Sequence, residues 1–249
     1  MPSPHLYLLG APKFELNRKP VQVGSAKAVA LLGYLAATGE PQSRERILGL
    51  LWSESAEDAA RKNLRNTLWS IRKALGDGVL MSGDDHLSID KSVWIDVREF
   101  EKLVTPSAIS DPEPAIRLFR GDLLEGIDIA DAPEFEVWLT GARERLAQLY
   151  SRALSTEVES LRDRSDWHGV IDMARRALAH DNLQEPMYRA LMQAHGRLGE
   201  RAEALRQYDT LHSTLERELG VEPLPETQSL RAAILNGSIL PDDGSGAVA

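Results

Sequence analysis

The stretch that decides the fold is "ARKNLRNTLWSIRKALG", residues 60–76, which carries five Lys or Arg side chains and no acid. When successive residues are stepped by about 100° around a helix, its aliphatic residues share one face. That face holds Leu64, Leu68, Ile71 and Leu75. The opposite face holds Lys62, Asn66 and Lys73, flanked by Arg65, Trp69 and Ser70, with Arg61 and Arg72 near the boundary. The pattern predicts an amphipathic helix over Asp58–Leu75 with a cationic solvent face, ended by Gly76.

The residues before this helix predict short strands and then two further helices. Runs rich in β-type residues at 5–10, 13–16 and 20–23 are separated by turn residues, which is typical of antiparallel strands. Apolar residues at helical spacing then predict helices over 26–37 and 43–52, the second with Ser43 as its N-cap.

The residues on either side of the cationic helix predict its N-terminal cap and a hairpin after its end. Ser55 and Asp58 have the spacing of a capping box at its start. After it, "VLMS" (79–82) and "HLSID" (86–90) flank a Gly-Asp-Asp turn and predict a β-hairpin. Strands, three helices and a hairpin, in that order, predict an α+β winged helix-turn-helix in which the cationic helix is the third.

From residue 96 onward the pattern is helical, and it contains a weak internal repeat. "WHGVIDMARRAL" (167–178) and "RAEALRQYDTL" (201–211) each follow a helix and a short turn. Helix pairs that recur at this spacing predict an all-α domain of tetratricopeptide-like repeats. We therefore expect a winged-helix domain over 1–95, a helical domain over 96–237, and a disordered tail over 238–249.

Composition and charge exclude several classes of function. The 249-residue chain has a net charge of −9 and no cysteine, which excludes disulfides and thiolate chemistry. Residues 1–100 have a net charge of +1 and residues 101–249 of −10, so the cationic helix stands out against an acidic chain. The N-terminus lacks the features of a signal peptide, and no apolar run is long enough to span a bilayer. We expect a cytoplasmic protein that does not bind membranes.

No constellation of catalytic residues is present in the sequence. It lacks the GxxxxGK[ST], HExxH and GxSxG motifs, and its six histidines have no metal-ligand spacing. We therefore expect neither an enzyme nor a bound metal or cofactor.

The cationic helix has the side chains that bind DNA. Lys and Arg neutralise phosphates or bond guanine, and Asn suits adenine. The candidate contacts are Arg61, Lys62, Arg65, Asn66, Trp69, Ser70 and Lys73. No acid between Arg61 and Gly76 offsets this charge. Large aromatic residues are usually buried, so packing at a domain interface is favoured for Trp69 over a DNA contact. The acidic hairpin turn, with Asp84 and Asp85, either stays off the phosphates or leaves the contact to His86 and Lys91.

Two stretches resemble one known family. Residues 43–52, "SRERILGLLW", together with 60–76 resemble the OmpR-type winged-helix domain of the antibiotic regulatory (SARP) family of bacterial transcriptional activators. Residues 183–235 are similar to the bacterial transcriptional activator domain of the same family, most specifically "GERAEALRQY" (199–208) and "LERELGVEPLPE" (215–226). Together the two halves cover about residues 5–237.

The resemblance implies an activator that binds direct repeats in double-stranded promoter DNA, often as side-by-side protomers, and recruits RNA polymerase. It makes the third helix the recognition helix and adds Ser43 and Arg44, at the start of the second helix, as candidate phosphate contacts. Two alternatives stay open. The acidic repeats could serve an adaptor or sensor that uses the winged domain as a protein interface, or the chain could be the regulatory fragment of a larger signalling regulator.

Overall fold

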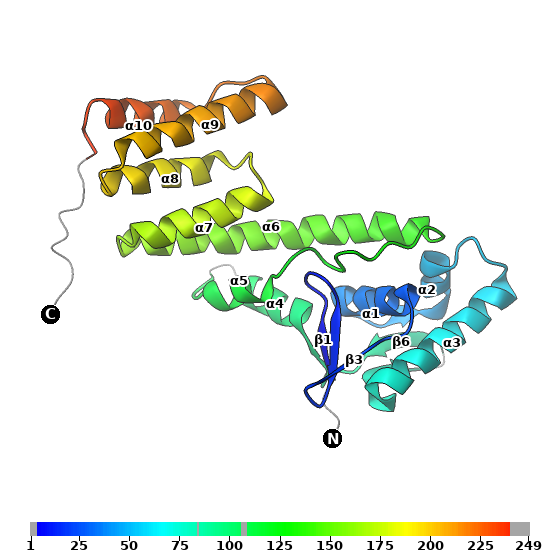
Figure 1. The fold of residues 1–249 in the computed structure, drawn as a ribbon. Coiled ribbons are helices and arrows are strands. Elements are labelled where there is room, and N and C mark those ends of the chain that lie inside the picture. The colour runs from blue at the N-terminus through cyan, green and yellow to red at the C-terminus, as the bar shows by residue number, and fades with distance from the viewer. Residues whose placement is uncertain (1–3, 84, 106–108, 240–249) are drawn as a thin grey trace. The chain divides into compact units, whose positions relative to one another are not determined.

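The computed structural model describes residues 4–83, 85–105 and 109–239, and the chain divides into two compact units, Met1–Tyr150 and Ser151–Ala249 (Figure 1). The first unit contains two small sheets and five helices, followed by the first part of a long sixth helix. The second unit contains helices only within its described residues. The predicted architecture, a winged helix-turn-helix followed by helical repeats, is confirmed.

The first unit begins with the predicted strands. They are β1 (Pro4–Tyr7), β2 (Lys13–Leu16) and β3 (Lys19–Val21), paired antiparallel in that order. The β2–β3 connection is tight because Asn17 and Arg18 both adopt positive φ angles of 55° and 62°, as a two-residue hairpin turn of type I′ requires. The sequence did not indicate a fourth strand, β7 (Trp94–Ile95), which pairs parallel to β1 at the other edge.

The three predicted helices follow. They are α1 (Ala26–Thr38), α2 (Arg44–Leu51) and α3 (Glu57–Leu75). Ser43 caps α2 as predicted, since its hydroxyl accepts from the Arg46 N–H at 3.2 Å. Gly76 ends α3 with a φ of 93°. The predicted capping box is wrong: Ala56 is the N-cap of α3, so Ser55 lies one residue too early for its hydroxyl to cap the helix.

The predicted hairpin is present and belongs to a second sheet. The 3-10 turn η1 (Asp77–Val79) leads into β5 (Leu80–Ser82), which pairs antiparallel with β6 (His86–Ile89). A two-residue strand, β4 (Gln42–Ser43), pairs with the outer side of β6. This pairing places the start of α2 directly beside the hairpin. Asp84, at the predicted turn, lies outside the described residues.

A buried carboxylate joins the N-terminal sheet to the next helix of the same unit. Asp96, the first residue of α4 (Asp96–Val104), is 1% exposed. It accepts hydrogen bonds from the backbone N–H groups of Leu8 (2.8 Å) and Leu9 (3.0 Å), and from the Arg120 guanidinium at 3.2 Å. Burial raises the pKa of Asp96, against the effect of these donors.

Helices α5 (Glu113–Leu118) and α6 (Pro133–Asp163) complete the first unit, α6 continuing beyond it. Within the unit the Phe119 ring stacks on the Tyr150 ring, with centroids 4.1 Å apart. Contacts divide the chain at residue 150, because residues after 96 also pack onto the winged-helix elements; the Trp138 ring of α6, for example, lies 4.9 Å from the Tyr34 ring of α1.

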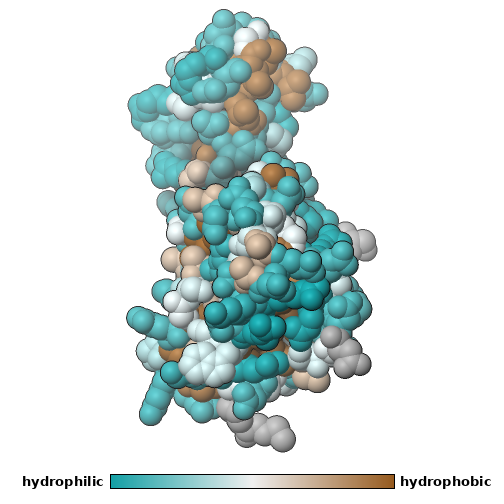
Figure 2. Space-filling view, turned by 90° about the vertical axis from the view of Figure 1, so that its right-hand side faces the viewer, coloured by the Kyte–Doolittle hydropathy of each residue, from teal (hydrophilic) through white to brown (hydrophobic). Residues whose placement is uncertain are grey.

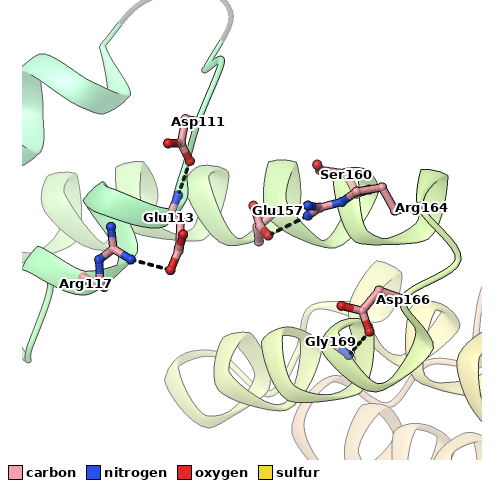
Figure 3. A network of polar contacts seen from close by, with 8 residues as sticks. All are labelled: Asp111, Glu113, Arg117, Glu157, Ser160, Arg164, Asp166 and Gly169. Carbon is pink, nitrogen blue, oxygen red and sulfur yellow. Dashed lines mark hydrogen bonds and ion pairs between the residues drawn. The ribbon is translucent and has the colours of Figure 1, made fainter. Parts of the chain in front are cut away.

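The second unit is an up-and-down stack of helices. After the end of α6 come α7 (Trp167–His180), α8 (Glu185–Arg197), α9 (Arg201–Leu219) and α10 (Pro225–Leu235), each reversing direction (Figure 1). The repeated segments 167–178 and 201–211 lie in α7 and α9, as predicted. Asp166 caps α7 by accepting from the Gly169 N–H at 3.0 Å, and Arg164 reaches back to Glu157 near the end of α6 (Figure 3).

Two apolar clusters hold this stack together. One joins Tyr188 of α8 to Leu211 and Leu215 of α9. The other joins α8, α9 and α10 and includes Ile239, which packs beside Gly196. Ile239, which lies in the stretch predicted as a tail, contributes to this cluster. Residues 240–249 of that tail lie outside the described residues.

Candidate nucleic-acid interface

Helix α3 has the two faces that its sequence predicts. Its aliphatic stripe is buried in the first unit, each member at most 4% exposed: Leu64, Leu68, Ile71 and Leu75. The exposed side chains of the opposite face are Lys62, Arg65, Asn66, Trp69 and Lys73. The structure thus brings five of the predicted contacts onto one solvent-facing surface, which we call the α3 face.

The cations of the α3 region differ in whether they are already paired. Arg61 forms an ion pair with Glu57 one turn earlier. Among the residues that the structure describes, no acid pairs with Lys62, Arg65 or Lys73. The expectation that nothing offsets the charge is therefore wrong for Arg61, because Glu57 stands at its i−4 position, just before the cationic stretch 60–76. It holds for the other three.

The start of α2 and the hairpin border the α3 face on one side. An open groove of about 940 Å³ runs between α2 and α3, with Arg44, Arg61 and Arg65 in its lining. Arg44 donates from its guanidinium to the Ser82 hydroxyl at 2.8 Å, and its backbone N–H donates to the Asp85 carbonyl. The Ser43 hydroxyl is engaged as the helix cap. Of the two predicted phosphate contacts, only Arg44 keeps charged donors directed outside its helix.

On the other side, α3 packs against the loop before α1. A Cβ atom placed on Gly24 would lie 2.7 Å from the Ser70 hydroxyl oxygen, so Ser70 faces this loop at close range. Ser70 is accordingly only partly exposed, unlike the five residues of the α3 face. Of the predicted contacts on α3, all of whose residues are described, only Ser70 is not fully exposed.

An ion pair that the sequence did not indicate lies on the same side. The Lys27 ammonium is 2.7 Å from an Asp131 carboxylate oxygen and 5.4 Å from the centroid of the Trp52 ring. The hydrogen bond from Lys27 lowers the pKa of Asp131. Lys27 lies in the first turn of α1, so the ion pair joins α1 to the loop before α6, beside Trp52 at the end of α2. Because 104 residues separate its charged partners, no local pattern could reveal it.

Trp69 does not pack at an interface within its own unit. Its side chain is 64% exposed, and the expectation of burial is wrong there because its neighbours on the helix surface are polar. The Lys73 ammonium lies 4.9 Å from the centroid of the indole ring. The α3 face therefore contains an exposed aromatic plane with a cation stacked on it.

The described parts of the chain were compared with the features of metal centres and of membrane-spanning helices. Among residues 4–83, 85–105 and 109–239 there is no group of three or more His, Asp or Glu side chains placed to hold a metal ion. No helix in these ranges is long and apolar enough to cross a membrane.

Comparison with known proteins identifies the family. The model of the bacterial transcriptional activator domain matches residues 95–235. Regulatory protein AfsR of Streptomyces coelicolor is 26% identical over 237 residues, which are 92% of this chain and 24% of AfsR. The chain thus spans about a quarter of the length of this relative.

A solved structure shows the same fold. Mycobacterium tuberculosis EmbR, in complex with a low-affinity phosphopeptide, superposes with a TM-score of 0.69 at 21% identity, covering 95% of this chain and 66% of that one. The family match covers more than half of the chain and begins one residue before α4. The chain belongs to the bacterial transcriptional activator domain family.

Proposed function

We propose that this protein is a sequence-specific activator that binds direct repeats in promoter DNA through the α3 face and recruits RNA polymerase. The observation that carries the proposal is the composition of that face. Lys62, Arg65 and Lys73 project from it without an acidic partner among the described residues, beside the amide of Asn66. Unpaired cations release counterions from phosphates, and an amide can bond the edge of adenine.

The winged-helix frame supports this use of α3. In helix-turn-helix proteins the second helix of the motif lies in the major groove while the helix before it meets the DNA backbone. Here α3 is that second helix, and Arg44 at the start of α2 stands where a phosphate contact is expected. Asp85 beside Arg44 makes the hairpin a poor phosphate ligand, so we assign the backbone contact on this side to Arg44.

The second unit offers a surface suited to a protein partner. Leu219, Val221 and Leu224, around the α9–α10 turn, are each about half exposed. Figure 2 shows hydrophobic surface gathered over this end of the helical unit. The turn is held in place, because the buried carboxylate of Glu185 accepts from the Leu224 N–H at 2.7 Å.

Four exposed acids border this apolar turn: Glu216, Glu218, Glu222 and Glu226. Acids this dense disfavour contact with DNA, whereas an ordered, exposed apolar cluster is typical of a protein-binding surface. We therefore assign this turn, rather than the α3 face, to the polymerase contact.

In vitro selection tests the DNA-binding part of the proposal. The full chain is incubated with a pool of random-sequence duplexes, and bound DNA is amplified over several rounds. We expect enrichment of one motif that occurs twice in the same orientation. A variant with Lys62→Ala and Lys73→Ala, both exposed and distant from the core, serves as the matched control and should enrich nothing. If the unaltered chain also enriches no motif, the adaptor interpretation replaces the activator.

A further inference from the structure

The α3 face contains one group that phosphate binding leaves unexplained, the indole of Trp69. Helix α3, all of whose residues are described, exposes no other large hydrophobic side chain. An isolated Lys or Arg on this face suffices for phosphate contact, whereas an exposed indole presents apolar area to water.

The position of Trp69 on the helix is central to the α3 face. By the helical periodicity of about 100° per residue, Trp69 lies between Arg65 and Lys62 around the helix axis, near the middle of the five residues of the α3 face. The Lys73 ammonium, 4.9 Å from the ring centroid, restrains the indole by a cation–π contact. The ring is therefore held at the surface that would enter the major groove.

The major groove contains one kind of apolar group, the C5-methyl of thymine. The other base edges present hydrogen-bond donors and acceptors, and an indole can donate one hydrogen bond but accept none. An exposed indole at the centre of a reading face therefore matches a thymine methyl better than any other base edge. We propose that Trp69 is a specificity-determining residue that packs against a thymine methyl in each half-site. The inference rests on the proposed function.

Replacing thymine by deoxyuridine tests this directly, since the exchange removes the methyl and keeps every hydrogen-bonding group. The selected duplex is prepared with one thymine at a time exchanged in each half-site, and affinity is measured by fluorescence anisotropy. We expect one position per half-site at which the exchange weakens binding about fourfold, the effect of losing one buried methyl. The Trp69→Ala variant should bind the thymine duplex more weakly and show no penalty at that position.

Two further variants make the result specific. Lys62→Ala keeps the indole, so it should bind more weakly and retain the deoxyuridine penalty. Trp69→Phe keeps an aromatic ring and should retain part of it. Because Trp69 is 64% exposed, neither of its substitutions removes core packing.

The proposal is overturned if no exchange affects the unaltered protein, if Trp69→Ala keeps the full penalty, or if the selected half-site contains no fixed thymine. In each of these cases a selected motif still supports DNA binding. Failure of the selection itself would instead count against the proposed function.

Discussion

Replacing Lys62 by Ala, with Arg61→Ala as its matched control, separates a phosphate contact from a cation that is merely nearby. Both substitutions remove one positive charge from adjacent, exposed positions of α3. Arg61 is engaged by Glu57, whereas Lys62 has no acidic partner among the described residues. The two variants therefore differ in the availability of the charge rather than in its amount.

The expected magnitude is set by counterion release. Each phosphate contact contributes about 0.9 to the slope of log affinity against log salt, so Lys62→Ala should make that slope shallower by about 0.9 per bound protomer. Between about 50 and about 200 mM salt, the loss of affinity caused by the substitution should shrink by about 3.5-fold. Arg61→Ala should change the slope by less than half as much, because Arg61 is already paired with Glu57 and is less available to neutralise a phosphate.

Fluorescence anisotropy titrations of the selected duplex at four salt concentrations measure both slopes. Circular dichroism melting curves check that each variant is folded, as substitutions at exposed positions away from special contacts rarely change stability by more than about 0.5 kcal/mol. The reasoning is refuted if the two variants shift the slope equally, or if Lys62→Ala leaves it unchanged.

Three further predictions concern the frame and the second unit. Asp96→Asn should lower the free energy of unfolding by about 2–4 kcal/mol in urea denaturation, because an amide cannot accept from all the N–H donors at this buried site; a loss below about 0.5 kcal/mol, the range of exposed substitutions, would contradict this. Since burial raises the pKa of Asp96, the folded state binds its proton more tightly than the unfolded state. The free energy of unfolding of the unaltered protein, relative to that of Asp96→Asn, should therefore fall as pH rises from about 4 through the folded-state pKa of Asp96. If this difference rose with pH instead, the pKa of Asp96 would be lowered in the folded state and burial would not be the dominant effect. Leu224→Ser should leave DNA affinity unchanged and reduce transcription in a purified polymerase assay. Equal losses of DNA affinity and of transcription would instead mean that Leu224 is needed for folding and not for the polymerase contact.

The sequence indicates helix α3 well because one physical signal dominates there. The buried stripe of α3 repeats at about 3.6 residues over about three turns, so the sequence predicts the start of the helix to within one residue. The Ser43 cap and the hairpin were equally readable, since each depends on residues within a few positions of one another.

The features that the sequence could not reveal depend on long-range contacts. Strands of two residues, such as β4 and β7, have too few residues for an alternating pattern. The acceptor role of Asp96 requires Leu8 and Leu9, which lie more than 80 residues away. The partial burial of Ser70 depends on the approach of Gly24. By contrast, the pairing of Arg61 with Glu57 follows the i, i+4 rule and was present in the sequence.

The central claim is that the α3 face lies in the major groove, and directed cleavage of DNA tests it most directly. The chain has no native cysteine, so Asn66→Cys provides one attachment point for an iron chelate that cuts nearby DNA. Glu216→Cys, exposed on α9, is the control. We expect cuts confined to the centre of each half-site from position 66 and none there from position 216. Diffuse cleavage from position 66, or the same cuts from both positions, would contradict the account.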